Sequence, residues 1–561
     1  MAHYPQERAV RSVSADRRFR ALLVAAIVLA GAGVGTTVSG ALDRPAGLPG
    51  RAAAPPASTT TTAAPPAAAA TTTTTAATTT TASTPVPSAA SGPPVTAEAS
   101  APGRSTVAPV ATTSAPACPS GGCVTLDATS LTGPVDHAGS GFNLLPSSDT
   151  NSSQMRDLGA TMYRSVPAAG SAGLYNWGSW SSATAAGART TLILSDLWAQ
   201  TGKNGGPPPT PWSDWSSYTS WVRSTVQQIL ASGQRVDYWD VYNEPGWTGY
   251  YSPADFASET PDDLLQQFLV TYQAIRSVDP GAAIVGPSIG DWSLTPLPPN
   301  NLTHEPDLGT FLRFASAHSL TLAAVAWHDN GKPPATIYSD AEATWNLIRS
   351  LPGIGHPQMF LDKYGSRATQ PIPGWDVGYL STIARAGISS AERSCWDACT
   401  LATLDGLLTA GGAPTSDYYV RSTYARMTGH TVASSSSTES LAVLGSIDPA
   451  QNRVVALIGR LQGCAVSSWC DTVWNVPNTS RTPAPPADVE VHLLLPWATS
   501  RPAIQLSTET FQPGAAVSGP SPATPTAIAV APAGAGRTEV TFTIPGFPDG
   551  AAYNLTVTPG G

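Results

Sequence analysis

The segment Asp237–Pro245 holds the residues best suited to acid–base chemistry. It reads Asp-Tyr-Trp-Asp-Val-Tyr-Asn-Glu-Pro, and its aromatic and β-branched middle is typical of a buried strand. Pro245 cannot continue a central strand, so we expect the strand to stop at Glu244. A carboxylic acid then stands at the C-terminal end of a strand, with the amide of Asn243 beside it. The alternative is a helix N-terminus, with Asn243 as cap and Glu244 in the first turn.

The elements around this segment alternate between short apolar strands and helical stretches, as in an α/β barrel. Helices are predicted over Asp214–Ala231 and Asp262–Ser277, the second opened by Thr260 as cap and Pro261 in the first turn. A final helix near Ser416–Met427 closes the barrel. The eight predicted strands are Gly141–Leu145, Thr161–Val166, Thr190–Leu194, Tyr238–Tyr242, Ala283–Gly286, Ala323–Trp327, Gln358–Leu361 and Ala391–Trp396. The predicted fold is α/β, a (β/α)8 TIM barrel, in which the C-terminal strand ends face the active site.

Several of these strand ends carry a pattern that resembles the clan A glycoside hydrolases. Arg164 ends the second strand in Met-Tyr-Arg, and Asn243 and Glu244 end the fourth. Val285-Gly-Pro-Ser288 matches the fifth strand, and His328 follows Trp327 on the sixth. The pattern is most similar to glycoside hydrolase family 39, the β-xylosidases and α-L-iduronidases, which also pair a barrel with a small β-sandwich. It covers roughly half the chain.

The resemblance implies a role for each matching residue. Glu244 would be the acid/base, and Asn243 would bond the 2-hydroxyl of a sugar. Arg164 would hold the nucleophile, with a buried structural ion pair as its alternative role. His328 would bind a sugar hydroxyl or the nucleophile, unless it is a hydrogen-bonded histidine of the barrel. The aromatic residues expected to stack on sugar faces are Trp198, Trp247 and Trp396.

The seventh strand departs from the family pattern. It continues Leu-Asp-Lys-Tyr, so Lys363 stands where the family has the nucleophilic glutamate before an aromatic residue. An ammonium group cannot form the glycosyl ester of a retaining reaction. Lys363 beside Glu244 would instead form an ion pair and keep Glu244 ionised. Asp362 is adjacent, but neighbouring strand residues are expected to point to opposite faces, and Asp397 is a weaker substitute.

The N-terminal part of the chain predicts export. Residues 1–20 are basic, and Ala21 to Leu42 is an uncharged, mostly apolar run with a small-residue Ser-Gly-Ala site near its end. Residues 1–42 therefore fit either a cleaved signal peptide or a transmembrane anchor. The charge before the run places the following chain outside the cytoplasm. Residues 43–117 consist mainly of Ala, Thr, Pro and Ser, which predicts a disordered linker.

The predicted barrel domain spans 118–430, and an all-β pattern follows over 431–561. Strands expected at Leu441–Ile447, Val454–Arg460, Val489–Leu495, Thr538–Ile544 and Tyr553–Val557 suggest a β-sandwich. A short strand near Val124 is expected to join it. The six cysteines form three close pairs that fit disulfides of an exported protein: Cys118/Cys123, Cys395/Cys399 and Cys464/Cys470. No pair has Cys-x-x-Cys spacing, so a zinc site is disfavoured, and we expect no metal or cofactor.

Composition narrows the choice of partner. The net charge of −9 and the pI near 5.3 argue against nucleic acid or an anionic membrane surface. Sixteen Trp residues suit a core or a surface that stacks on carbohydrate. The first hypothesis is a secreted or surface-anchored retaining glycoside hydrolase that acts on a polysaccharide, with Lys363 placing its activity in question. The second is a catalytically inactive carbohydrate-binding protein on the same barrel, and the third is an adhesion or wall protein without a concave aromatic site.

Overall fold

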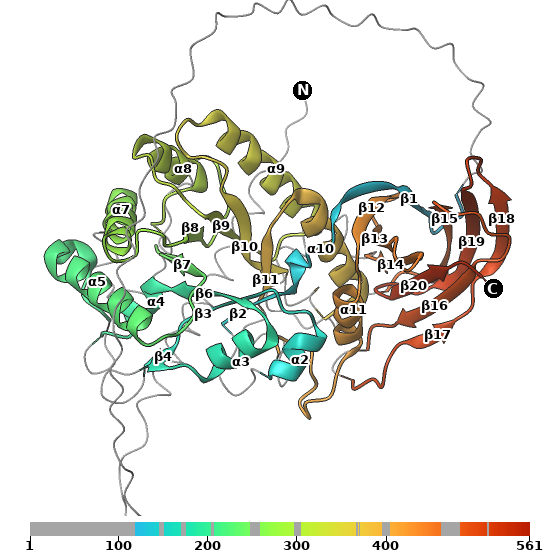
Figure 1. Cartoon of the computed structure of the whole chain (residues 1–561), viewed down its shortest axis with the longest axis horizontal. Coiled ribbons are helices and arrows are strands. Elements are labelled where there is room, and N and C mark those ends of the chain that lie inside the picture. Colours follow the sequence, from blue (N-terminus) through green and yellow to red (C-terminus); the bar gives the residue numbers. More distant parts are fainter. Residues whose placement is uncertain are drawn as a thin grey trace, which may run out of the picture. The chain divides into compact units, whose positions relative to one another are not determined.

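The computed structural model describes residues 118–144, 151–169, 175–202, 207–246, 259–296, 304–365, 369, 371–394, 404–461, 483–512 and 515–560. Its centre is a closed barrel of eight strands in the order β10-β11-β2-β3-β6-β7-β8-β9 (Figure 1). All neighbouring pairs in it are parallel. The barrel strands are β2 (Gly141–Asn143), β3 (Met162–Ser165), β6 (Arg189–Ile193), β7 (Tyr238–Asp240), β8 (Ile284–Ile289), β9 (Ala324–Asn330), β10 (Gln358–Gly365) and β11 (Ser390–Arg393). Each overlaps one of the eight predicted strands, so the predicted TIM barrel is confirmed.

Helices alternate with these strands along the chain. They are α2 (Ser152–Asp157), α3 (Gly178–Ala186), α4 (Leu194–Ala199), α5 (Trp215–Ala231), α7 (Pro261–Val278), α8 (Leu308–Ala317), α9 (Pro334–Ser350), α10 (Pro373–Ala386) and α11 (Ser416–Ala425). The predicted start of α7 is confirmed, because Thr260 and Asp263 form a reciprocal capping box and Pro261 occupies the first turn. Short pieces accompany them: η1 (Ala138–Ser140), η4 (Pro211–Ser213), β4 (Ala168–Ala169) and β5 (Tyr175–Asn176).

The C-terminal domain is a curled sheet of ten strands in the order β17-β16-β20-β14-β13-β12-β1-β15-β19-β18 (Figure 1). Its strands are β1 (Cys123–Pro134), β12 (His430–Ser436), β13 (Leu441–Asp448), β14 (Arg453–Arg460), β15 (Ala487–Leu495), β16 (Ala503–Glu509), β17 (Ser521–Ala523), β18 (Thr526–Pro532), β19 (Thr538–Phe547) and β20 (Ala552–Thr558). The strand near Val124 joins this sheet as predicted, since β1 pairs with β12 and β15. The sheet is therefore built from chain segments on both sides of the barrel.

The sheet and the barrel share an apolar core through α10. This helix contacts β13 and β14, and Gly374 N donates to Gly550 O at 2.8 Å. A side chain at Gly374 would collide with the backbone of Arg460 and Ala551, so glycine allows this close approach. The backbone contact fixes α10 against the sheet. In the chain, α10 connects β10 and β11, the last two barrel strands.

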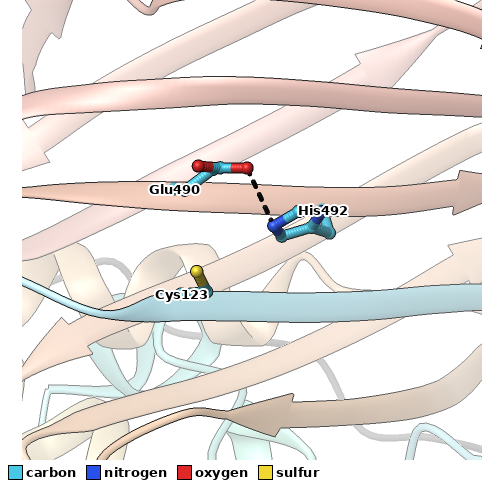
Figure 2. A group of neighbouring side chains, drawn as sticks. All are labelled: Cys123, Glu490 and His492. Carbon is cyan, nitrogen blue, oxygen red and sulfur yellow. Dashed lines mark ion pairs between the residues drawn. The ribbon is translucent and has the colours of Figure 1, made fainter. Parts of the chain in front are cut away.

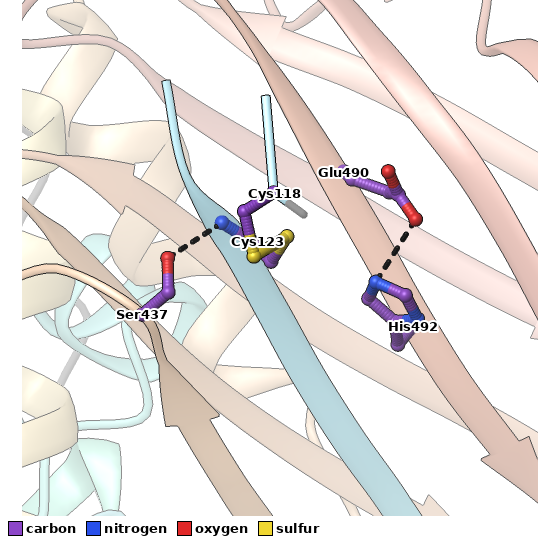
Figure 3. The surroundings of a disulfide bond; sticks show 5 residues. All are labelled: Cys118, Cys123, Ser437, Glu490 and His492. Carbon is purple, nitrogen blue, oxygen red and sulfur yellow. Dashed lines mark hydrogen bonds and ion pairs between the residues drawn. A yellow bond between two sulfur atoms is a disulfide. The ribbon is translucent and has the colours of Figure 1, made fainter. Parts of the chain in front are cut away.

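Cys118 and Cys123 form a disulfide at the start of β1, as the sequence predicts (Figure 3). The Cys123 amide donates to Ser437 Oγ at 2.8 Å, which ties the bridge to the end of β12. Glu490 and His492 on β15 lie beside Cys123 and pair with each other at 3.0 Å (Figure 2). Because the Cys123 sulfur is engaged in the disulfide, this group is a structural feature of the sheet. The other predicted cysteine pairs lie outside the described residues.

Within the described ranges, no helix is long and apolar enough to cross a membrane. The predicted signal or anchor at 1–42 and the linker at 43–117 lie outside these ranges and stay predictions.

Candidate active site

Glu244 lies just beyond β7, at the C-terminal end of the barrel strands. Its amide donates to the carbonyl of Ser288 on β8 at 3.0 Å, and its backbone is left-handed, with φ of 54°. A non-glycine residue in this conformation costs about 1–3 kcal/mol, which the surrounding structure must hold in place. The conformation turns the chain at the strand end, and the side chain of Glu244 remains 21% exposed. The carboxyl group is therefore open to a ligand.

Two basic side chains from neighbouring strands contact this carboxyl group. Lys363 Nζ of β10 lies 3.0 Å from Glu244 Oε1, and His328 Nδ1 of β9 lies 2.9 Å from the same oxygen. Burial alone would raise the pKa of Glu244, but Lys363 and His328 outweigh it and lower the pKa below its ordinary value. Glu244 is therefore a carboxylate at neutral pH. A proton donor requires the opposite shift, so Lys363 has the predicted effect on Glu244.

The same neighbouring charges also shift the pKa values of His328 and Lys363, the two partners of Glu244. Burial lowers the pKa of His328 to about 4, and the nearby Lys363 ammonium adds to the effect. His328 is thus neutral at pH 7 and donates its Nδ1 hydrogen to Glu244. Burial and Arg164 lower the pKa of Lys363, while Glu244 raises it, and the net direction is down. Lys363 and Arg164 therefore repel each other inside the barrel.

Arg164 lies at the end of β3 with a fully buried side chain. Its guanidinium group lies 2.7 Å from Asp240 Oδ2 on β7 and 3.2 Å from Asp362 Oδ2 on β10. It also donates to Asn243 Oδ1 at 3.2 Å and to Asn143 Oδ1 at 3.0 Å. The planar fork of arginine suits this set of contacts, so Arg164 ties β2, β7 and β10 together beneath Glu244.

Asp362 departs from the expectation that it faces away from the barrel interior. The pairing of β10 with β9 is irregular between Leu361 and Lys363, and the pairing with β11 is irregular between Leu361 and Tyr364. Such a bulge breaks the strict alternation of side chains along a strand. As a result Asp362 reaches Arg164 while Lys363 reaches Glu244, and both point into the barrel. Arg164 thus holds two fully buried carboxylates, Asp240 and Asp362.

Asn243 is held between these groups and a further acid. Its backbone N–H donates to Ser195 Oγ at 3.0 Å, and its side-chain Nδ2 lies 3.5 Å from Asp196 Oδ2. Asp196 lies in the first turn of α4, the helix that follows β6, and raises the pKa of both Arg164 and Lys363. The structure therefore brings together Arg164, Asn243, Glu244, His328 and Lys363, the five strand-end residues singled out in the sequence.

The buried polar atoms around this site that have no hydrogen-bond partner among the described residues include His328 Nε2 and Asn143 Nδ2, besides both carboxylate oxygens of Asp362. In the neutral tautomer that donates from Nδ1, His328 Nε2 is an acceptor, whereas Asn143 Nδ2 is a donor. Both atoms are buried, so neither is open to a ligand.

Of the three tryptophans expected to stack on sugars, only Trp198 lies within the described residues. Trp198 lies on α4 with only 7% of its surface exposed, and it packs edge-on against Tyr218 and Trp221. This position leaves almost no ring face for the sugar stacking expected of Trp198. Trp247 and Trp396 lie outside the described residues, as does Asp397.

Three neighbours of this site carry little signal in the sequence. Asp240 ends β7 and Asp196 lies in the first turn of α4, so both could be found by listing every polar residue at or just after a barrel strand. Glu305 cannot, because it lies in the connection between β8 and α8, where no periodicity or motif marks it. Burial and the nearby Asp291 and Glu244 raise the pKa of Glu305 to about 8.

The barrel is shared with several solved structures of low sequence identity. A protein called N2152 from Neocallimastix frontalis aligns with a TM-score of 0.59 at 18% identity, over 78% of this chain and 100% of the other. A glucosidase from Croceicoccus marinus aligns with a TM-score of 0.55 at 13% identity, over 78% and 99%. A monomeric beta-xylosidase from Caulobacter crescentus aligns with a TM-score of 0.53 at 12% identity, over 78% and 99%. The chain therefore shares the fold of these structures, a closed parallel barrel with a separate β-sheet domain.

At these identities the likeness concerns the fold alone. No protein-family model matches the chain, and none of the curated proteins searched matches it in sequence. Glycoside hydrolysis requires two carboxyl groups flanking the scissile bond. At the strand ends of this barrel, Glu244 is an ionised carboxylate and Lys363 of β10 is the ammonium group that faces it.

Proposed function

We propose that this protein binds a polysaccharide at the C-terminal end of the barrel and acts on its O-glycosidic bonds. The observation that carries the proposal is the position of Glu244, a partly exposed carboxylate beyond the fourth barrel strand, in a fold shared with a glucosidase and a xylosidase. His328 contacts this carboxylate at 2.9 Å, and Arg164 holds the neighbouring Asn243 in place through its Oδ1. A polyhydroxylated ligand matches this mixture of donors and acceptors.

The chain lacks the residues that the retaining reaction of family 39 requires. That reaction needs a carboxylate where Lys363 lies and a protonated acid where Glu244 lies. The Lys363–Glu244 ion pair at 3.0 Å opposes both requirements. Retention is therefore proposed only for a variant with an acidic residue at position 363.

A second candidate function is carbohydrate binding without turnover, and the same ion pair favours it. The two candidates separate when binding and hydrolysis are measured in parallel on one panel of plant and microbial wall polysaccharides. Turnover that falls by about 10²–10⁴-fold in Glu244→Gln, with binding retained, supports hydrolysis. Binding without turnover in the unmodified protein supports the second candidate. Absence of both would reject the carbohydrate proposal.

We further propose that the protein is exported and held at the cell surface by its N-terminal segment. The basic residues before the apolar run at 21–42 support this orientation. Release of the protein into the medium, with a new N-terminus near Ala41, would instead identify a cleaved signal.

A further inference from the structure

The connection between β8 and α8 brings a second carboxyl group to the side of Glu244. Two residues after Glu244, Gly246 O accepts a hydrogen bond from His304 N at 3.0 Å. A side chain at Gly246 would overlap the backbone nitrogen of Glu305. The segments that follow the fourth and fifth barrel strands therefore pack backbone against backbone, and this contact fixes Glu305.

Gly290, at the end of β8, separates the two carboxyl groups. A methyl carbon at Gly290 would lie 3.3 Å from Glu305 Oε1 and 3.6 Å from Glu244 Cδ. The two carboxyl groups are thus no farther apart than the sum of these distances. That limit lies near the lower end, about 6.5 Å, of the separations that leave room for a water molecule between the two carboxyl groups of a glycosidase.

The surroundings of the two carboxyl groups differ in charge. Glu244 faces the Lys363 ammonium and the His328 Nδ1 hydrogen. Glu305 faces the Asp291 and Glu244 carboxylates, and it accepts hydrogen bonds from the amides of Gly290 at 3.0 Å and Asp291 at 3.3 Å. Despite these amides, burial and the two carboxylates keep the pKa of Glu305 near 8. Opposite shifts within one pair of carboxyl groups are the usual sign of an acid and its ionised partner.

We propose that Glu305 is the second carboxyl group of the site and donates the proton to the leaving oxygen of the glycosidic bond. This inference rests on the proposed carbohydrate function. It assigns Glu244 the role of the ionised partner and requires no carboxylate at position 363. Lys363 then becomes a positioning residue that keeps Glu244 ionised.

The reaction balances with one water molecule. Glu305 transfers its proton to the glycosidic oxygen, the bond from the anomeric carbon to that oxygen breaks, and its electron pair leaves with the oxygen as a hydroxyl group. The Glu244 carboxylate stabilises the positive charge at the anomeric carbon. Water adds to that carbon and gives a proton to Glu244 Oε2, since Lys363 and His328 both contact Oε1. A proton then returns from Glu244 to Glu305 through solvent.

The test compares Glu305→Gln with unmodified protein on paired aryl glycosides of glucose and xylose. A phenyl leaving group needs protonation, whereas a dinitrophenyl leaving group departs as a stable anion. Loss of the general acid is expected to slow phenyl glycosides by about 10²–10⁴-fold and dinitrophenyl glycosides by less than about tenfold. The rate on phenyl glycosides should also lose its decline above pH 8, because the proton that the unmodified protein loses there is absent from the variant.

Glu509→Gln is the matched control, because burial also raises the pKa of Glu509 to about 8, but it lies on β16 of the C-terminal sheet. This variant should hydrolyse both substrates at the unmodified rate. Equal slowing of both substrates by Glu305→Gln, or no slowing, overturns the inference. So does an unmodified protein that binds xylan or glucan oligosaccharides but cleaves neither aryl glycoside. If the unmodified protein binds no oligosaccharide at all, the proposed function itself is contradicted.

Discussion

Adjacent residues of β10 belong to two charged clusters that differ in kind. Lys363 points into the barrel and joins the mouth cluster, whereas Tyr364 joins the closing cluster between the barrel and its last helices. The mouth cluster consists of Arg164, Asp240, Glu244, His328, Asp362 and Lys363. The closing cluster consists of Tyr364, Asp376, Arg393, Asp417 and Arg421.

The closing cluster is balanced and sealed. Arg393 pairs with Asp376 at 3.3 Å and with Asp417 at 2.8 Å, and Arg421 pairs with Asp376 at 2.5 Å. None of these side chains is more than 2% exposed. Together they tie β11 to α10 and α11, and no ligand can reach them. Their role is to fix the last helices against the barrel.

The mouth cluster has an excess of acids and is open at one point. Three carboxylates face Arg164 and Lys363, and Glu244 keeps 21% of its side chain exposed. Buried acids behave alike in both clusters, because burial and an acidic neighbour raise the pKa of Asp240 in the mouth cluster and of Asp417 in the closing cluster to about 7. Ion pairing alone therefore does not mark a functional site. Charge imbalance combined with exposure does.

The largest change is expected from Lys363→Glu in the mouth cluster. It places a carboxylate across from Glu244, removes the repulsion with Arg164, and raises the pKa of Glu244 through a negative neighbour. Product of retained configuration, which the unmodified protein cannot form, should appear from aryl glycosides at least about 100-fold above the background rate. Initial rates and the anomeric configuration of the first product, followed by NMR, measure this.

Lys363→Met is the control for that change, because it removes the ammonium without adding a carboxylate. It should give no retained product. If Lys363→Glu is no faster than Lys363→Met, then position 363 does not lie where a nucleophile can act, and the resemblance at the seventh strand fails.

Arg421→Met tests the closing cluster and should mainly affect stability. It removes one partner of a buried ion pair and leaves Asp376 with a weaker set of contacts, which costs about 3–5 kcal/mol of unfolding free energy. Urea denaturation measures the loss. Arg385→Met on α10 is the control, since Arg385 is exposed and its loss should cost less than about 0.5 kcal/mol. Equal losses in the two variants would contradict the sealed role of the closing cluster.

The two clusters also differ in how far the sequence predicts them. Four residues of the mouth cluster were predictable, because a closed barrel brings the ends of its strands together whatever the loops do. They are Arg164, Glu244, His328 and Lys363, whereas Asp240 and Asp362 were not assigned to the site. The closing cluster was not predictable, since its members Asp376, Asp417 and Arg421 lie within helices whose rotation no motif fixes. The predicted helix at Ser416–Met427 matches α11, but no range was predicted for α10.

The predictions from the sequence were wrong or incomplete where a backbone irregularity or a contact between loops sets the position of a side chain. Strict alternation placed Asp362 outside, but a bulge turned it inward. Glu305 reaches the site because Gly246 allows two connections to touch, a contact between segments about sixty residues apart that no local pattern encodes. Trp198 was assigned to the site as a strand-end aromatic, but it follows its strand on α4 and packs beneath α5.

Tyr364→Phe sharpens the comparison within a single strand. The Tyr364 hydroxyl accepts from Arg421 Nη2 at 2.7 Å and donates to Gly139 O at 3.1 Å. Its removal leaves a buried charged donor short of one partner, at a cost of about 1–2 kcal/mol. The thermal midpoint should fall while the pH profile of any turnover is unchanged. Tyr338→Phe, at a 38% exposed tyrosine, should change neither.

The smallest expected effect concerns pH and contrasts Glu305 beside the mouth cluster with Glu509 beside the closing cluster. Burial raises the pKa of each to about 8, helped by Asp291 and Glu244 at Glu305 and by Asp417 at Glu509. A carboxyl whose pKa is raised on folding contributes stability that is complete below its ordinary pKa of about 4.3 and is lost as pH rises toward 8. The unmodified protein should therefore be less stable at pH 8 than at pH 5.

Glu305→Gln and Glu509→Gln should each remove part of that decline, on the order of 1 kcal/mol after allowance for solvent. The clusters separate when oligosaccharide is added. A sugar hydroxyl that contacts Glu305 changes its titration, so bound ligand should alter the pH dependence that Glu305→Gln removes. The part removed by Glu509→Gln should stay the same, because the closing cluster is sealed. Urea titrations at pH 5 and pH 8, with and without xylan oligosaccharide, measure both. An equal response of the two variants to ligand would mean that Glu305 does not face the bound sugar.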